Sequence, residues 1–212
     1  MGAEVRIVTV LRSGGDFKPL HVQALQKQVG KYAPLASFEC LTDMKVEGVA
    51  CRLLKRGWPS WWSKLELFDP DMKGEFLFMD LDTVIVGPLD DILAVEKLTL
   101  LRDFYRDGKK FKEGLGGALI YSTEADRTPV WNDFIVRPGL SMAMNRRGDQ
   151  HYFEHFWLRK AARWQDVVPG QVVSYKVHCA NGVPPEARIV CFHGKPRPWE
   201  VPQFLHLYRG FA

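Results

Sequence analysis

The stretch "FLFMDLDTVIVGPL", residues 76–89, places two aspartates inside an apolar run. Four apolar residues precede Asp80 and Asp82, and the apolar pattern resumes at Val84. A continuous apolar run without alternation is typical of a central strand that is covered on both faces. Because burying part of a carboxylate pair is costly without a positive partner, the motif indicates that something cationic meets the end of this strand.

The segments around this strand predict an α/β fold. Residues 4–11, "EVRIVTVL", and residues 37–42, "SFECLT", have the composition of strands, and residues 19–29 between them have the apolar spacing of a helix. A strand–helix–strand opening indicates a βαβ unit and a parallel sheet. We therefore expect one domain over residues 1–212, with a central, mostly parallel sheet flanked by helices. Further strands are predicted at residues 98–104, 116–122 and 187–194, and further helices at residues 59–68, 126–136 and 150–163.

Composition excludes several classes of protein. The chain has 212 residues, of which 46% are hydrophobic, so a substantial core can form. A net charge of +4 is too mild for a nucleic-acid binder, although it allows peripheral contact with a membrane surface. The sequence has no run of 18 apolar residues, so we expect no transmembrane segment. The four cysteines lack paired spacing, which favours a reducing, cytoplasmic setting.

The two aspartates suit a metal ion. In an extended strand Asp80 and Asp82 point to the same side, where their charges repel. A hard divalent cation, Mn²⁺ or Mg²⁺, resolves that conflict, and ligands collect beyond the carboxyl ends of strands in open α/β sheets. A simple cap of the strand end or of a turn is the alternative interpretation.

A second segment near the C-terminus, "CFHGKPRPW" at residues 191–199, adds nitrogen and positive charge. His193 follows an apolar strand directly, and a neutral imidazole is a good ligand for Mn²⁺. Lys195 and Arg197 lie in the same Gly- and Pro-rich loop and suit phosphate oxygens.

With two further segments, these motifs resemble a known family. The chain is similar to the retaining, nucleotide-sugar-dependent glycosyltransferases of the glycogenin and bacterial galactosyltransferase type, glycosyltransferase family 8, which have the GT-A (Rossmann-like) fold. That family has an apolar strand ending in D-x-D, a Ser/Thr-Lys-Leu helix start, a Gly-Asp-Gln helix start and a late His-x-x-Gly-x-x-Lys-Pro-Trp motif. The corresponding segments here are Asp80-Leu81-Asp82, Ser63-Lys64-Leu65, Gly148-Asp149-Gln150 and, more loosely, "HGKPRPW".

The resemblance implies an activity and a set of site residues. The activity is transfer of a sugar from a nucleoside diphosphate sugar, with uridine as the expected base, to an acceptor hydroxyl with retention. The implied metal ligands are Asp80, Asp82 and His193, and the implied catalytic residues are Lys64, Asp149 and Gln150. The implied donor-binding residues are Thr9, Leu11, Asp80, Gly194, Lys195 and Arg197. Among these, Thr9 and Leu11 would border the nucleotide base and ribose.

Departures from the family pattern leave several points open. The histidine loop is two residues shorter, so either Lys195 or Arg197 takes the phosphate. Leu115-Gly116-Gly117 replaces the family's N-[AS]-G, which leaves the sugar undefined. The acceptor could be a glycan, a lipid-linked group or a protein.

Individual residues also have simpler interpretations. Lys64 could be an exposed helix charge, and Asp149 could cap the helix that follows it. Of Trp58, Trp61 and Trp62, at least one is expected in the core, and one could stack on a sugar at the rim of a cleft.

Two other functions remain as alternatives. "DLDTV" also matches the motif of haloacid-dehalogenase-like phosphatases, in which the first aspartate is a nucleophile. The chain could instead be a non-catalytic module that binds nucleotide or carbohydrate on a GT-A scaffold.

Overall fold

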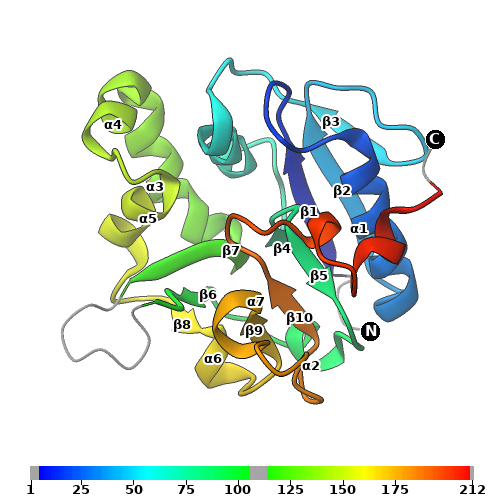
Figure 1. The fold of residues 1–212 in the computed structure, drawn as a ribbon. Helices are drawn as coiled ribbons and strands as arrows, with labels where there is room; N and C mark the ends of the chain where they lie inside the picture. The colour runs from blue at the N-terminus through cyan, green and yellow to red at the C-terminus, as the bar shows by residue number, and fades with distance from the viewer. Residues whose placement is uncertain (1–4, 106–113, 211–212) are drawn as a thin grey trace.

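Two β-sheets form the centre of the protein (Figure 1). A computed structural model describes residues 5–105 and 114–210. The larger sheet has seven strands in the order β3-β2-β1-β4-β7-β6-β8, and the smaller sheet has three in the order β5-β10-β9. Parallel pairs outnumber antiparallel pairs in the larger sheet, which confirms the predicted mostly parallel α/β architecture.

The βαβ opening has the predicted form. Strand β1 (Arg6–Leu11) and strand β2 (Ser37–Thr42) pair in parallel, and helix α1 (Pro19–Tyr32) connects them. Pro19 begins the helix, where its fixed φ and missing N–H carry no penalty. Strand β3 (Ala50–Leu53), which the sequence patterns did not indicate, extends the sheet beyond β2.

Strand β4 (Phe76–Met79) is the central strand, as its unbroken apolar sequence predicts. It pairs in parallel with β1 and antiparallel with β7 (Leu115–Ser122). Its side chains are all buried and divide between two core clusters: Leu77 and Met79 in one, Phe76 and Phe78 in the other. Both faces of the strand are therefore covered.

The acidic motif links the two sheets. Strand β5 (Thr83–Ile85) belongs to the smaller sheet, so residues 80–82 form the whole connection from β4 to the other sheet. Strand β5 pairs antiparallel with β10 (Ile189–Cys191), with Cys191 opposite Thr83. That register brings the loop after β10 to the acidic motif, because Phe192 N–H donates to the carbonyl of Asp82 at 3.1 Å.

Helices cover the larger sheet from the side opposite α1. They include a 3₁₀ helix, η1 (Ser60–Phe68), together with α3 (Glu124–Val136) and α5 (Asp149–Trp157). Helix α4 (Pro138–Met144) packs on α3. The prediction of one helix over residues 150–163 was wrong at its end. The helix ends at Trp157, and Ala162–Arg163 form β8, which pairs with β6 (Thr99–Arg102).

Short elements complete the described chain. They are α2 (Asp90–Leu93), α6 (Trp164–Val167), β9 (Val172–Ser174), α7 (Tyr175–His178), η2 (Pro198–Glu200) and η3 (Leu205–Tyr208). Within residues 5–105 and 114–210, none of the helices combines the length and apolarity that a membrane crossing requires. A single domain over residues 1–212 stays a prediction.

Candidate active site

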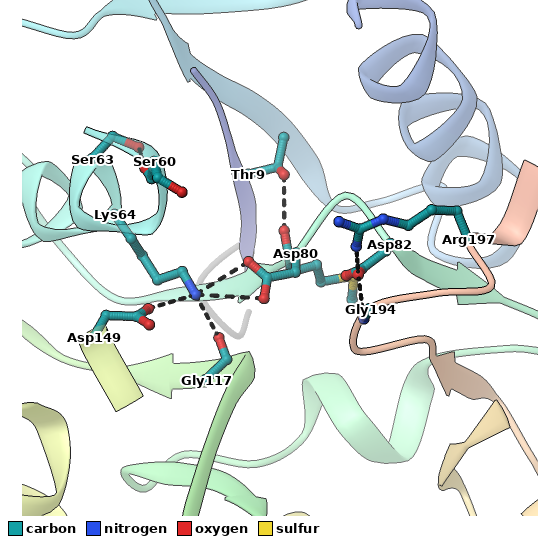
Figure 2. Close-up of polar contacts among 11 residues, drawn as sticks. Thr9, Ser60, Ser63, Lys64, Asp80, Asp82, Gly117, Asp149, Gly194 and Arg197 are labelled. Atoms are coloured by element: carbon teal, nitrogen blue, oxygen red, sulfur yellow. Dashed lines mark hydrogen bonds and ion pairs between the residues drawn. The ribbon is translucent and has the colours of Figure 1, made fainter. Parts of the chain in front are cut away.

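Lys64 is the centre of a buried ionic cluster at the carboxyl end of β4. Its Nζ lies 2.8 Å from Asp149 Oδ2 and 3.2 Å from Asp80 Oδ1, and it donates to the carbonyl of Gly117 at 3.1 Å (Figure 2). The four groups come from η1, from α5, from the end of β4 and from β7. The structure thus brings together Lys64, Asp80 and Asp149, which the sequence analysis assigned to one site.

The charges in this cluster do not balance. Burial lowers the pKa of Lys64, but the charges of Asp149 and Asp80 outweigh that effect, so the net shift is upward and the side chain stays protonated. Burial raises the pKa of Asp80 to about 7 despite the opposing effect of Lys64, and the charges of Asp82 and Asp149 add to the rise. The end of β4 therefore carries negative charge that Lys64 alone does not neutralise.

Two glycines lie next to this cluster, and one of them makes room for it. A Cβ on Gly117 would lie 3.3 Å from Gln150 Cγ, 3.5 Å from Lys64 Nζ and 3.6 Å from Asp149 Oδ2. The three predicted catalytic residues therefore converge on the bare backbone of β7. Gly148, with φ of +92°, precedes α5 and is its N-cap residue, so Asp149 is the first helical residue and not the cap. The carboxylate of Asp149 is buried and is directed to Lys64.

Arg197 makes a second ion pair, with the other aspartate of the motif. Arg197 Nη1 donates to Asp82 Oδ2, and the backbone N–H of Gly194 donates to the same oxygen at 3.5 Å (Figure 2). Arg197 Nη2 also lies 3.4 Å from Asp16. Lys195 is 75% exposed and pairs with Glu200 at 3.7 Å. Of the two predicted phosphate-binding cations, the structure brings Arg197 to the acidic motif and leaves Lys195 on the surface.

His193 is held by other partners than the predicted ones. Its Nε2 lies 2.6 Å from Ser174 Oγ, and its ring stacks on Phe104 at 5.6 Å and meets the edge of Tyr105 at 5.0 Å. Burial, followed by the charge of Lys176, lowers the pKa of His193, although Asp82 opposes this. The imidazole is therefore neutral near pH 7, as a metal ligand must be. Its role as a ligand stays a prediction.

Thr9 and Leu11, expected beside the nucleotide, have fully buried side chains in β1. Thr9 Oγ1 donates to the carbonyl of Met79 at 2.8 Å and so ties β1 to the end of β4. In this arrangement both side chains contribute to the core, and their contact with a nucleotide stays a prediction.

These contacts bear on whether the acidic motif can hold a metal ion. In the described ranges, no group of three or more His, Cys, Asp or Glu side chains is arranged to hold a metal ion. Mg²⁺-type ions are, however, usually held by one or two carboxylates, with substrate phosphates completing the shell. Asp80 and Asp82 fit that role because they offer two carboxylates, two residues apart, at the end of β4. The metal itself stays a prediction.

Three further residues belong to the site, although the sequence analysis did not assign them to it. Gly117 accepts from Lys64, Ser174 contacts His193, and Asp16 contacts Arg197. For Gly117 a signal existed, since a glycine inside a strand marks a close approach of another group. The partners of His193 and Arg197 come from distant segments, which no local pattern indicates.

Comparisons with known proteins concern the fold of this chain. No protein-family model and no curated protein matches the sequence. The galactosyltransferase LgtC, solved in complex with donor and acceptor sugar analogs, matches with a TM-score of 0.68 at 12% identity, over 96% of this chain and 95% of that one. The glycosyltransferase GlyE of Streptococcus pneumoniae TIGR4 has a TM-score of 0.70 at 11% identity, over 98% of this chain but 61% of its own.

A third similar structure is the bifunctional glycosyltransferase WbbM, with a TM-score of 0.66 at 12% identity over 99% of this chain. This chain spans only 50% of the WbbM chain. At such low identities the likeness concerns the path of the backbone and not the individual side chains. The chain therefore has the GT-A fold that it shares with LgtC, GlyE and WbbM.

Proposed function

We propose that this protein is a glycosyltransferase that moves a sugar from a nucleoside diphosphate sugar to an acceptor hydroxyl. The observation that carries the proposal is the ion-pair cluster of Lys64 with Asp80 and Asp149, at the carboxyl end of the central strand of a GT-A fold. Beside it, Arg197 provides a second fixed cation. Open α/β sheets bind ligands at this end of their strands.

The hard step of such a transfer is departure of the diphosphate. Arg197 and Lys64 supply preorganised positive charge for the phosphate oxygens as negative charge develops on them. Asp149 is held beside Lys64, where its carboxylate stabilises positive charge on the sugar ring. Gln150, next along α5, positions the sugar near the reacting carbon. The leaving phosphate accepts the proton of the acceptor hydroxyl, so no separate strong base is required.

Asp80 and Asp82 would hold Mn²⁺ or Mg²⁺ together with the diphosphate. Such an ion supplies Lewis-acid stabilisation of the leaving group. Uridine as the base and retention of configuration are further parts of the proposal and rest on the resemblance to glycosyltransferase family 8. The complex of LgtC with donor and acceptor sugar analogs supports a two-substrate site in this fold.

The two alternatives are less well supported. In a haloacid-dehalogenase-like phosphatase the acidic motif would follow the first strand, whereas here β1, β2 and β3 all precede it, and the fold is shared with glycosyltransferases. A non-catalytic module does not need a buried lysine between two carboxylates, since such an arrangement lowers stability relative to an apolar core.

The test is a screen of nucleotide sugars for release of nucleoside diphosphate, with Mn²⁺, with Mg²⁺ and with a chelator. We expect release from a uridine diphosphate sugar, and a loss of about 100-fold or more in Asp149→Asn. Asp71→Asn is the matched control, because Asp71 is 65% exposed and pairs with the exposed Lys55 and not with a residue of the cluster. Absence of both turnover and thermal stabilisation by every nucleotide tested, in a folded protein, would refute the proposal.

A further inference from the structure

Trp61 differs from the two tryptophans beside it. Trp58 and Trp62 are only 8% and 6% exposed, and both pack on Phe134, at 4.8 Å and 5.7 Å between ring centroids. Trp61 is 52% exposed. Two of the three indoles are thus core residues, and the third presents a large apolar face to solvent.

The 3₁₀ geometry of η1 directs Trp61 to the candidate active site. In a 3₁₀ helix residues three apart lie on the same face, with a rise of about 2 Å per residue. Trp61 and Lys64 are three apart in η1 (Ser60–Phe68), so the indole lies one turn before the lysine on the face that meets Asp80 and Asp149.

A second element fixes the indole there. A Cβ on Gly148 would lie 2.9 Å from Trp61 Nε1 and 3.2 Å from Cδ1 and Cε2, so the ring packs directly on this glycine. Gly148 immediately precedes Asp149, whose carboxylate is 2.8 Å from Lys64 Nζ. The indole therefore borders the catalytic cluster from both η1 and the start of α5.

The backbone before Trp61 is strained. Ser60 has φ of +50°, a left-handed conformation that costs a non-glycine residue about 1 kcal/mol. Conformations of this kind persist where the surroundings over-determine them, and they cluster at ligand sites. Here the strained residue starts the helix that carries both the exposed indole and Lys64.

The order of groups along the site assigns the indole to one substrate. Figure 2 shows Ser60, Ser63 and Lys64 on η1 at one side of Asp80, and Arg197 and Gly194 at the other. A donor whose diphosphate meets Arg197 would extend its sugar toward Lys64 and Asp149, and Trp61, between Ser60 and Ser63 on η1, belongs to that same side of the site.

We propose that Trp61 is the platform of the acceptor subsite, on which the apolar face of a pyranose ring of a glycan acceptor stacks. The inference rests on the proposed function. A flat, rigid aromatic face with a polar edge suits a sugar, because the ring packs on its C–H face while its hydroxyls stay hydrated. The chemical class of the acceptor is thereby a glycan, with a terminal sugar bound next to Lys64.

The experiment compares Trp61→Ala and Trp61→Phe with wild type in two assays. The first is hydrolysis of the nucleotide sugar without acceptor, and the second is stimulation of nucleoside diphosphate release by lactose, cellobiose or maltose at millimolar concentration. In Trp61→Ala we expect hydrolysis within about twofold of wild type, and a roughly tenfold higher sugar concentration for half-maximal stimulation. In Trp61→Phe, which keeps an aromatic face, this concentration should rise by less than in Trp61→Ala. Leu35→Ala, at an 85% exposed apolar position outside the site, is the control and should change neither value.

A second readout does not depend on turnover. The indole N–H signal of Trp61 in a ¹H–¹⁵N spectrum is identified by its loss in Trp61→Phe. It should move when one of the three disaccharides is added and not when uridine diphosphate alone is added. An equal loss of hydrolysis and stimulation in Trp61→Ala, movement with the nucleotide alone, or no response of wild type to any disaccharide in either assay would overturn the inference. Wild-type protein that neither binds nor cleaves any nucleotide sugar would instead refute the proposed function.

Discussion

The two cation–carboxylate pairs of the site are built in different ways. Lys64, on η1, is 7% exposed and is held by groups from three other elements around the larger sheet, including the backbone of β7. Arg197 is 18% exposed and comes from the loop after β10, where it pairs with Asp82 and reaches Asp16 on the surface. The first pair is fixed by the core, whereas the second depends on how the C-terminal segment packs on α1. The difference indicates a rigid part for the reacting sugar and a separately anchored part for the diphosphate.

The largest expected effect breaks the first pair. Lys64→Met leaves the buried Asp149 and the partly exposed Asp80 without their cation, and removing one partner of a buried ion pair costs roughly 3–5 kcal/mol of unfolding free energy. Urea denaturation followed by circular dichroism measures the loss. Lys55→Met is the matched control, because Lys55 and Asp71 form an exposed pair and its removal should leave the midpoint nearly unchanged. Equal shifts in the two variants would show that the cluster is not a buried unit.

The second prediction concerns pH and the anchoring of the C-terminal segment. His21 on α1 stacks on Trp199 with ring centroids 3.8 Å apart. Burial, with smaller effects of Lys18 and Arg197, lowers the pKa of His21 to about 4 from its ordinary 6.5. Because His21 takes up its proton at a lower pH in the folded protein than in the unfolded chain, the contribution of neutral His21 to stability is complete above pH 6.5. That contribution is lost progressively as the pH falls from 6.5 to about 4, and the total loss is about 3 kcal/mol of unfolding free energy.

Urea midpoints between pH 7.5 and pH 4 measure this loss, and His21→Gln should have a flatter profile than wild type over the same range. Profiles of identical slope in the two proteins would show that His21 is not the titrating group. The comparison thus tests whether the Arg197 region weakens in acid through its contact with α1.

The third prediction distinguishes the two cations of the loop. Arg197→Ala should weaken binding of uridine diphosphate by about tenfold, because a charge-assisted contact to phosphate is lost. Lys195→Ala should change the affinity by less than about twofold, since Lys195 is 75% exposed and pairs with Glu200. Isothermal titration calorimetry gives both values. A larger effect of Lys195 than of Arg197 would reverse the assignment of the phosphate-binding cation.

The smallest expected effect concerns the strained residue before Trp61. Ser60→Gly relieves the left-handed backbone at φ of +50° and should raise the unfolding free energy by about 0.5 kcal/mol. Ser63→Gly, inside the same helix, should lower it by about 0.5–1 kcal/mol, because the helix loses a side chain whose Oγ donates to the carbonyl of Ser60. Thermal unfolding resolves the opposite signs, and changes of the same sign would show that Ser60 is not strained.

Much of the framework followed from local patterns. The unbroken apolar run of residues 76–79 predicted the central strand, and "SFECLT" became β2 with the predicted bounds. The end of the helix after residue 150 was predicted wrongly, because pairing of Ala162–Arg163 with β6 outweighs helix propensity there. Propensity also could not tell a 3₁₀ helix from an α-helix in residues 60–68, although that difference decides the direction of Trp61.

The site was predicted in part. The motif resemblance grouped Lys64, Asp80 and Asp149, which the structure brings into contact. It could not give the partner of His193, since Ser174 is on β9 and approaches only because β9 and β10 pair. Nor could it choose between Lys195 and Arg197, because the choice depends on how the loop folds after β10.

The short connection at residues 80–82 has a consequence for ligand binding. It is the point where the chain passes from the larger sheet to the smaller one, and each of its aspartates is paired with a cation from a different part of the molecule. A donor whose sugar lies at Lys64 and whose diphosphate contacts Arg197 would act as a non-covalent cross-link between the sheets. Donor binding would then stabilise the packing of the two sheets on one another. Because residues from both sheets form the binding site, a bound donor would also stabilise the site itself.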